Sequence, residues 1–433
     1  MWDASTASRS LLGAIGGAAM ATGLFTDTAA ADTIFLSTQL RPIEEATKVR
    51  NEILAGVKTP VEYVVEEPPQ FAVRMEAERQ AGKGTISLVG ALHGELAPLV
   101  PKGTLKTLDD LSARLSDRGI PDDLMKLGKL GTEHQHYIPW MQATYVMVAN
   151  KEALPFLPEG ANVDTLTYAQ LTEWGRRIAA GTGRRKIGFP AGPTGLMPRF
   201  FQGYFYPSFT GGVVRPFKSA AAAAAWQALK DLWAFTTPSS LSFGFMQEPL
   251  LSTEVWIAWD HLARVKEAIS LEPDRFVVFP APAGPNGRGY MPVIAGLAIP
   301  VAGPDPAGAE AVIEHLTLPE TQILTAQEVG FFPVGKATLP DDLDPAVEAL
   351  SRAIATTQNA PDALVSLLPV GLGGKGGEFN KIFMDAFQRI IIRDEPIEEV
   401  LGEEAEKLQA LMIKTGASCW VPDAESQGAC PVD

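Results

Sequence analysis

The residues best suited to chemistry are aromatic, amide, imidazole and carboxylate side chains that follow short apolar runs. They are Gln39 after the first run, His93 and Glu95 after the third, Trp140 and Gln142 in the IPWMQ loop, Trp259, Asp260 and His261 at the end of VWIAW, and Tyr290 and Phe331 in later loops. Ligands of parallel α/β sheets bind beyond the carboxyl ends of the strands. Aromatic rings stack on the apolar faces of sugars, and Asp, Gln and His bond hydroxyl groups. The set therefore predicts a site for a sugar-like ligand, the alternative being that each aromatic residue belongs to the core.

Motifs for covalent catalysis, phosphate binding and metal binding are missing. The sequence has no G-x-S-x-G, no H-E-x-x-H and no phosphate-binding loop. Gly371–Gly376 (GLGGKG) matches a dinucleotide-binding pattern, but Pro369 would spoil the preceding strand, so we interpret the segment as a surface loop. The pair His134 and His136 fits a solvated polar loop. We therefore predict no catalytic residues, no cofactor and no metal site.

Alternating strands and helices must position these side chains. The first part of the chain predicts strands at Thr33–Leu36, Val61–Val65, Ile86–Val89 and Tyr145–Ala149, and helices from Pro42, at Phe71–Arg79 and at Leu108–Leu115. Such alternation indicates βαβ units, and it predicts an α/β fold with a largely parallel sheet.

The same pattern recurs after residue 150. It predicts helices at Thr167–Ala180, after the cap Ser219, at Ala307–Leu316 and in two closing segments that contain Phe379–Ile390 and Ile397–Met412, and strands at Ile187–Phe189, Trp256–Trp259, Phe276–Phe279 and Ala295–Pro300. The recurrence predicts two α/β lobes, with the chain crossing between them more than once.

The N-terminus and the cysteines predict export. Arg9 precedes an apolar stretch at Leu11–Phe25, and Ala29–Ala31 forms an A-x-A cleavage site, which is the layout of a signal peptide. A buried N-terminal helix is the alternative. The only cysteines are Cys419 and Cys430, which an oxidising compartment would join in a disulfide, with two free thiols as the alternative. We expect cleavage near Ala31 and a periplasmic location.

Length and charge restrict the class of protein. The chain has 433 residues, of which 46% are hydrophobic, so it can bury a large core in two or three domains. Its formal net charge of -15 disfavours nucleic acids and anionic membrane surfaces as partners, since proteins that bind them concentrate Lys and Arg.

A series of short segments resembles the bacterial extracellular solute-binding proteins of family 1, the sugar-binding type of ABC importers that includes maltose-binding protein. The segments are Gly103–Leu111 (GTLKTLDDL), Tyr137–Leu154 with Asn150 and Lys151, Thr167–Trp174 (TYAQLTEW), Gly203–Val213, Phe279–Gly284 (FPAPAG), Gly296–Pro300 (GLAIP) and Leu318–Val334. Their order and spacing carry the resemblance. The chain departs from the family at Trp259–Leu262, where D-G-S-W is usual, so its ligand need not be a common sugar.

The resemblance implies a two-lobe periplasmic-binding-protein fold of type II with a hinge and an interlobe ligand cleft. We expect an N-lobe at residues 32–147, completed by about 296–345, and a C-lobe at 148–295, completed by about 346–433. The resemblance implies ligand contacts in three places, and Tyr204 lies in a segment that also lines family clefts. The three places are the loop with His93 and Glu95, the IPWMQ loop with Trp140 and Gln142, and the loop Trp259–His261. The implied protein is a monomer that captures a sugar, oligosaccharide or polyol by hinge closure and delivers it to the transmembrane subunits of an ABC permease. An exported carbohydrate-active enzyme is the alternative function.

Overall fold

The structure is a computed structural model that describes residues 33–433 except 338–339 and 341–342. Residues 32–433 form one compact unit. The predicted signal peptide lies outside the described residues. No helix in the described part of the chain combines the length and apolar character needed to cross a membrane.

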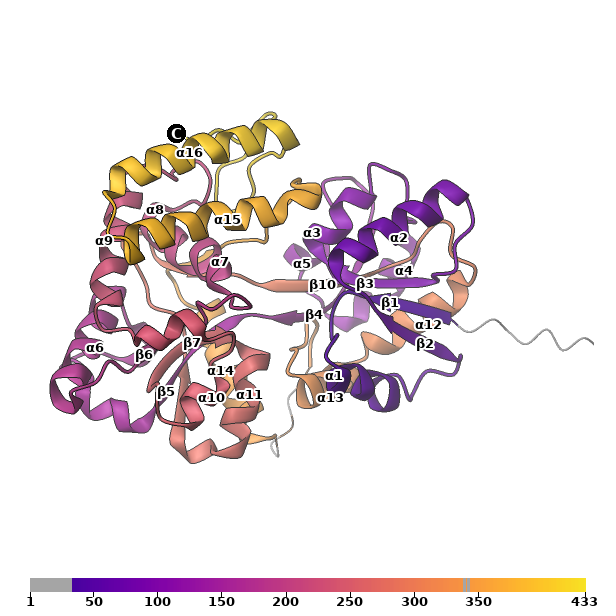
Figure 1. Cartoon of the computed structure of the whole chain (residues 1–433). Coiled ribbons are helices and arrows are strands. Elements are labelled where there is room, and N and C mark those ends of the chain that lie inside the picture. The colour runs from indigo at the N-terminus through magenta and orange to yellow at the C-terminus, as the bar shows by residue number, and fades with distance from the viewer. Residues whose placement is uncertain (1–32, 338–339, 341–342) are drawn as a thin grey trace, which may run out of the picture. The chain divides into compact units, whose positions relative to one another are not determined.

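The first sheet has five strands in the order β2-β1-β3-β10-β4 (Figure 1). Its strands are β1 (Thr33–Ser37), β2 (Val61–Val65), β3 (Leu88–Leu92), β4 (Ile138–Ala143) and β10 (Val293–Ala298). Strand β1 is parallel to β2 and β3, whereas β10 is antiparallel to both β3 and β4.

The second sheet has four strands in the order β6-β7-β5-β8. They are β5 (Tyr145–Asn150), β6 (Ile187–Gly188), β7 (Ile257–His261) and β8 (Phe276–Phe279). Strands β6 and β7 are parallel, and β5 is antiparallel to β7 and β8. A separate parallel pair is formed by β9 (Arg288–Tyr290) and β11 (Ala363–Val365).

Both sheets are largely parallel, as predicted, except for one reversed strand in each. The reversed strands are β10 in the first sheet and β5 in the second, and the sequence analysis did not predict these reversals. Strand β5 follows β4 of the first sheet, and β10 follows β9. The chain passes from β4 to β5 through a single residue, Thr144. A strand that arrives from the neighbouring lobe enters at the end where the parallel strands finish, so it must run in the opposite direction.

Helices surround both sheets. Around the first sheet lie α1 (Ile43–Lys48), α2 (Pro68–Ala81), α3 (His93–Leu96), α4 (Asp109–Arg114), α5 (Asp122–Leu127), α12 (Pro306–Leu316) and α13 (Pro319–Val329). Around the second lie α6 (Tyr168–Thr182), α7 (Met197–Phe200), α8 (Tyr206–Thr210), α9 (Ala220–Trp233), α10 (Gln247–Leu251), α11 (Leu262–Leu271) and α14 (Pro345–Gln358). The closing helices α15 (Gly376–Phe387) and α16 (Ile397–Thr415) pack on each other beside α9, as the yellow ribbons of Figure 1 show. The Ser219 hydroxyl accepts the Ala222 N–H, so the predicted cap is confirmed.

The IPWMQ segment is a strand, which corrects the prediction of a loop. It forms β4, and the register against β10 shifts between Ala295 and Gly296, which places Pro139 opposite Gly296. A strand tolerates proline at such an irregularity because the ladder is already interrupted there. Tyr290 is likewise the last residue of β9 rather than part of a loop.

The C-terminal segment is fixed to the second lobe. The predicted disulfide joins Cys419 and Cys430, whose Cα atoms lie 4.6 Å apart. Within the loop that it closes, one Asp423 carboxylate oxygen accepts the N–H groups of Val213 and Val214 at 2.8 and 3.0 Å. This segment therefore binds a loop more than 200 residues earlier in the chain.

Candidate functional site

The carboxyl ends of strands from both sheets meet at the crossover residue Thr144. In the first sheet Ala143, the last residue of β4, pairs with Val293 at the start of β10. In the second sheet Tyr145, the first residue of β5, pairs with His261 at the end of β7. Because Thr144 separates these pairs, the strand ends of the two sheets face the same region, where α/β folds place their ligands.

On the side of the first sheet, Gln39 and Glu95 are brought together through Thr38. The Thr38 hydroxyl donates a hydrogen bond of 2.6 Å to Glu95 Oε2, and Gln39 Nε2 donates one of 3.0 Å to Thr38 Oγ1. The Leu92 N–H donates to the same Glu95 oxygen at 2.9 Å. Burial raises the pKa of Glu95, while these hydrogen bonds and the charges of Arg41 and Arg199 act in the opposite direction. The arrangement offers an amide and a fixed carboxyl group to a polar ligand.

His93 begins the short helix that follows β3. Its Nδ1 lies at hydrogen-bonding distance, 3.0 Å, from the hydroxyl of the buried Tyr137. Burial lowers the pKa of His93 to about 4, so the imidazole is neutral at pH 7. A neutral imidazole can bond a ligand through its second nitrogen without adding a charge.

On the side of the second sheet, Tyr145 is the centre of an aromatic cluster. Its ring stacks on that of Trp259, with centroids 4.8 Å apart and an angle of 4° between the planes, and meets the ring of Tyr204 edge-on at 5.5 Å. The centroid of the His261 ring lies 5.1 Å from that of the Tyr145 ring and 5.7 Å from that of the Phe331 ring. Tyr145, Trp259 and Tyr204 are buried, whereas His261 is only half-buried. The structure thus brings three predicted residues together around Tyr145, and a fourth, Phe331, lies beside His261.

Asp260 lies on the opposite face of β7 from Trp259 and His261, as the alternation of side chains along a strand requires. Its carboxylate is fully buried and accepts the N–H groups of Met246 and His261 at 2.9 and 2.7 Å. Burial raises the pKa of Asp260 to about 7, although the charge of Arg264 and these bonds lower it. Asp260 therefore ties the segment before α10 to β7, behind the aromatic cluster.

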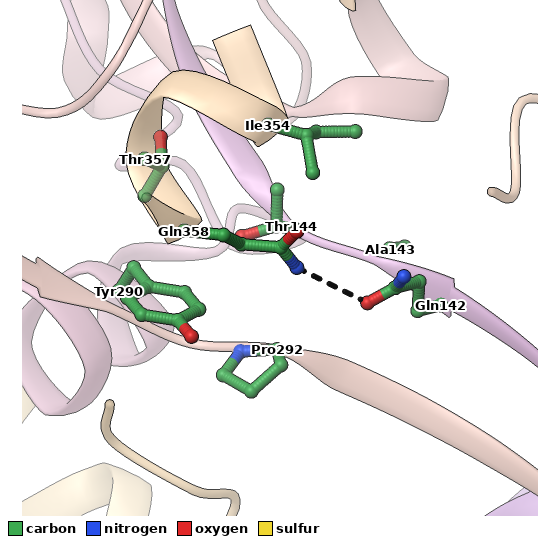
Figure 2. A pocket seen from close by; sticks show the side chains of 8 residues that line it. All are labelled: Gln142, Ala143, Thr144, Tyr290, Pro292, Ile354, Thr357 and Gln358. Atoms are coloured by element: carbon green, nitrogen blue, oxygen red, sulfur yellow. Dashed lines mark hydrogen bonds between the residues drawn. The ribbon is translucent and has the colours of Figure 1, made fainter. Parts of the chain in front are cut away.

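Gln142 and Tyr290 line a different hollow, at the crossover itself. Figure 2 shows both around the hollow with Thr144, Pro292, Ile354 and Gln358. Gln142 Nε2 donates a hydrogen bond of 2.7 Å to the carbonyl oxygen of Pro333. Gln358 Nε2 donates one of 3.3 Å to Gln142 Oε1. Gln142 thus joins the first crossover to the segment around residue 333 and to the end of α14.

Trp140 lies inside the first lobe, away from the other predicted residues. It is 0% exposed, and its ring centroid is 5.5 Å from that of Phe35. A Cβ atom added at Gly90 would lie 3.1 Å from the Trp140 ring, so β3 packs directly on the indole. In this structure Trp140 packs as a core residue.

Several residues of the site were not predicted from the sequence. Thr38 lies next to a predicted residue, and Tyr145 starts a predicted strand, so position alone could have suggested both. Arg264 follows Asp260 by four residues, at the start of a helix after a strand, which is also a readable signal. Arg199 has no such signal, because its charge acts on Glu95, more than 100 residues earlier in the chain.

Within the described residues, no group of three or more His, Cys, Asp or Glu side chains is arranged to hold a metal ion. The site offers hydrogen-bonding groups and charges, from Gln39 and Glu95 on one side and His261 on the other. Such an arrangement can hold a small polar molecule.

Comparison with known proteins assigns the family. The profile of the bacterial extracellular solute-binding proteins matches residues 55–323, which is more than half of the chain. The chain belongs to this family. Comparison with curated proteins gave no match.

Solved structures share the two-lobe, type II fold of this solute-binding protein. Maltose-bound MalE3 of T. maritima has a TM-score of 0.70 at 16% identity, over 88% of this chain and 100% of that one. MalE of Xanthomonas citri has a TM-score of 0.70 at 16% identity, over 88% of this chain and 98% of that one. UgpB of Mycobacterium tuberculosis, in complex with glycerophosphocholine, has a TM-score of 0.69 at 17% identity, over 89% of this chain and 99% of that one. At these identities the likeness concerns the fold.

Proposed function

We propose that this protein is the periplasmic solute-binding component of an ABC importer. It captures a sugar, oligosaccharide or polyol between its two lobes, closes about the hinge, releases the solute unchanged and delivers it to the transmembrane subunits of a permease. The observation that carries the proposal is the meeting of strand carboxyl ends from both sheets at Thr144.

The two sides of this region support capture of a hydroxyl-rich solute. Gln39 and Glu95 offer an amide and a carboxyl group from the first lobe, and His261 contributes a half-buried imidazole from the second. Amide, carboxyl and imidazole groups bond hydroxyls. Structural neighbours have been solved with maltose, α-D-tagatose and glycerophosphocholine bound, which supports this class of solute.

The connections between the lobes support closure. The first passes through the single residue Thr144, and a second follows β9 through residues 291–292. The Phe332 N–H donates to the Gln142 carbonyl at 2.7 Å, which adds a short link to β4. A few residues at the ends of elements can absorb the change in backbone angles that lobe closure needs. We take the lobe limits as 32–147 with about 296–345, and 148–295 with about 346–433.

A thermal-shift screen of the purified protein, unfolded and refolded to remove carried-over solute, tests the proposal. A solute at 100 times its Kd stabilises the native state by about 2.7 kcal/mol, so a cleft ligand should raise the Tm by several degrees. The panel contains sugars, oligosaccharides, polyols and sugar phosphates. Gln39→Ala should weaken binding of the best solute, and Gln80→Ala, an exposed amide on α2, is the matched control. A panel without any stabilising member, or conversion of the solute to a product, would contradict the proposal.

A further inference from the structure

Strand β2 forms one edge of the first sheet, so its backbone pairs with a neighbouring strand, β1, on one side only (Figure 1). The Pro60 carbonyl accepts the Thr33 N–H, and at the other end of the strand the Glu66 N–H donates to the Ser37 carbonyl. In a parallel pair every second residue directs its backbone groups to the neighbouring strand, so the even-numbered residues of this segment face β1. The residues whose N–H and C=O groups face outward are Val61, Tyr63 and Val65.

The side chain of Arg50 caps the middle of this outward edge. Arg50 belongs to the short helical segment Val49–Ile53, and its Nε and Nη2 atoms each donate a hydrogen bond of 3.1 Å to the Tyr63 carbonyl oxygen. Its guanidinium carbon lies 5.8 Å from the centroid of the buried Tyr63 ring. Among the described residues Arg50 forms no ion pair, so this carbonyl is the partner of its guanidinium group.

The other outward backbone groups of β2 have no partner in the part of the chain that the structure describes. They are the N–H and C=O groups of Val61 and Val65 and the N–H group of Tyr63, and these residues line a surface groove together with Arg50. Free N–H and C=O groups on an edge strand are a template for pairing with another chain. The sequence VEYVV favours such pairing, because β-branched and aromatic residues suit strands.

The remaining edges of the two main sheets are shielded in other ways within the described residues. At β4, Gln142 exchanges two backbone hydrogen bonds with Phe332. At β8, Arg352 Nη2 donates a hydrogen bond of 2.5 Å to the Val278 carbonyl. Strand β6 has only two residues, and short edge strands offer little to pair with. Strand β2 is longer than β6 and β8, and a single side chain caps its outward edge.

A second copy of β2 fits this edge in an antiparallel register. Pairing centred on Tyr63 places Val61 opposite Val65, so the outward groups of both strands meet in hydrogen-bonded pairs. Glu62 then lies opposite Val64, so no two acidic side chains of the strands face each other. The arrangement has two-fold symmetry, and it therefore closes as a dimer instead of growing into a filament.

We propose that the outward edge of β2 is a pairing surface for a second copy of this chain, and that Arg50 keeps the protein monomeric by occupying the Tyr63 carbonyl at the centre of that register. Paired strands lie about 4.8 Å apart. The guanidinium group, 3.1 Å from the carbonyl oxygen, occupies the place of the second strand, so pairing must displace it. The inference concerns a surface separate from the solute site and does not depend on the proposed function.

Analytical ultracentrifugation over a series of protein concentrations tests the inference. The wild type should sediment as a monomer, and Arg50→Ala should form a species of twice the monomer mass as its concentration rises. Arg50→Met keeps the length of the side chain without its donors; it should also dimerise, and it replaces Arg50→Ala if that variant fails to fold. Arg185→Ala, which removes an exposed arginine before β6, is the matched control and should stay monomeric.

A proline on the outward edge separates strand pairing from other kinds of association. Val65→Pro removes an outward N–H group and leaves the hydrogen bonds to β1 in place, and edge strands tolerate proline at such positions. The double variant Arg50→Ala, Val65→Pro should therefore return to a monomer. Val61→Pro removes the equivalent donor and is used if the double variant fails to fold.

Hydrogen exchange places the contact on β2. The outward amides of Tyr63 and Val65 should exchange rapidly in the wild-type monomer and slowly in the Arg50→Ala dimer, because pairing gives them acceptors. A wild type that is already dimeric, or Arg50 variants that stay monomeric at every concentration, would overturn the inference. Association that persists in the proline variant, or that leaves these amides unprotected, would show that another surface is used and would overturn it as well.

Discussion

The rings of Tyr145 and Trp259 lie parallel, 4.8 Å between centroids, on neighbouring antiparallel strands of the second sheet. Tyr145 pairs with His261, so the stacked partner is its diagonal neighbour, two residues along β7. This stack fixes the first residue of β5 directly after the crossover at Thr144 and so connects the aromatic cluster to the hinge.

Removing the Tyr145 ring should destabilise the protein more than removing its hydroxyl. Tyr145 is 4% exposed, and Tyr145→Ala should lower the free energy of unfolding by roughly 3–5 kcal/mol, as for other large aromatic residues in cores. Tyr145→Phe keeps the ring and its stack and should cost at most about 1.5 kcal/mol, because only the hydroxyl group is removed. Urea unfolding of both variants measures the difference, and equal losses would show that the stack contributes nothing.

Trp140→Ala should act on stability first. The indole is fully buried against Phe35 and β3, so its loss should cost roughly 3–5 kcal/mol of unfolding free energy. Gln39→Ala, at the surface of the site, should cost less than about 1 kcal/mol and weaken solute binding instead. Unfolding curves and titrations on both variants give the comparison. A stable Trp140→Ala protein with selectively lost binding would instead place Trp140 in the ligand site.

Opening the disulfide should destabilise the second lobe. Cys419 and Cys430 are separated by 11 residues, and closing a loop of this length contributes about 2–3 kcal/mol by restricting the unfolded chain. The double variant Cys419→Ser, Cys430→Ser should therefore have a lower Tm, measured by calorimetry. Reductant should lower the Tm of the wild type and leave that of the variant unchanged. A Tm independent of both changes would contradict the prediction.

His261 should make stability sensitive to acid. Burial lowers its pKa from 6.5 to about 3 in the native state, so between these values the unfolded chain binds more protons. Its contribution is complete above pH 6.5 and is lost as the pH falls toward 3. His261→Asn keeps an acceptor for the Ala263 N–H, which His261 Nδ1 now accepts at 3.3 Å.

The comparison of the two proteins isolates this effect. Asp260, whose pKa is raised to about 7, has the opposite pH dependence but is present in both. From pH 6.5 to 4, the unfolding free energy of the wild type should fall more steeply than that of His261→Asn. The difference between the two slopes should correspond to the uptake of at most about one proton on unfolding. Parallel pH profiles from chemical unfolding would show that His261 titrates normally in the native state.

The sequence predicted the elements and the largely parallel sheets, but not the two reversed strands. Periodicity located β1, β5 and the helices because burial on one face leaves a repeating pattern. The reversal of β5 and β10 could not be seen, since strand direction depends on which lobe a strand enters from. Pro139 led us to expect a loop, because the irregularity opposite Gly296 that accommodates it belongs to a strand distant in the sequence.

The same limit applies to the site. Strand ends indicated Gln39, Glu95 and His261, because residue order alone places them there. Burial separated Trp140 from these residues, and burial depends on packing that no local pattern records. The charge of Arg199 acts on Glu95 only after both lobes have folded.

Small-angle X-ray scattering of the wild-type protein, with and without a saturating amount of its best solute, tests the central claim most directly. Closure of two lobes around a solute predicts a smaller radius of gyration in the bound state, and mass spectrometry should recover the solute unchanged. An unchanged radius of gyration at saturation, or a solute converted to product, would contradict capture by hinge closure.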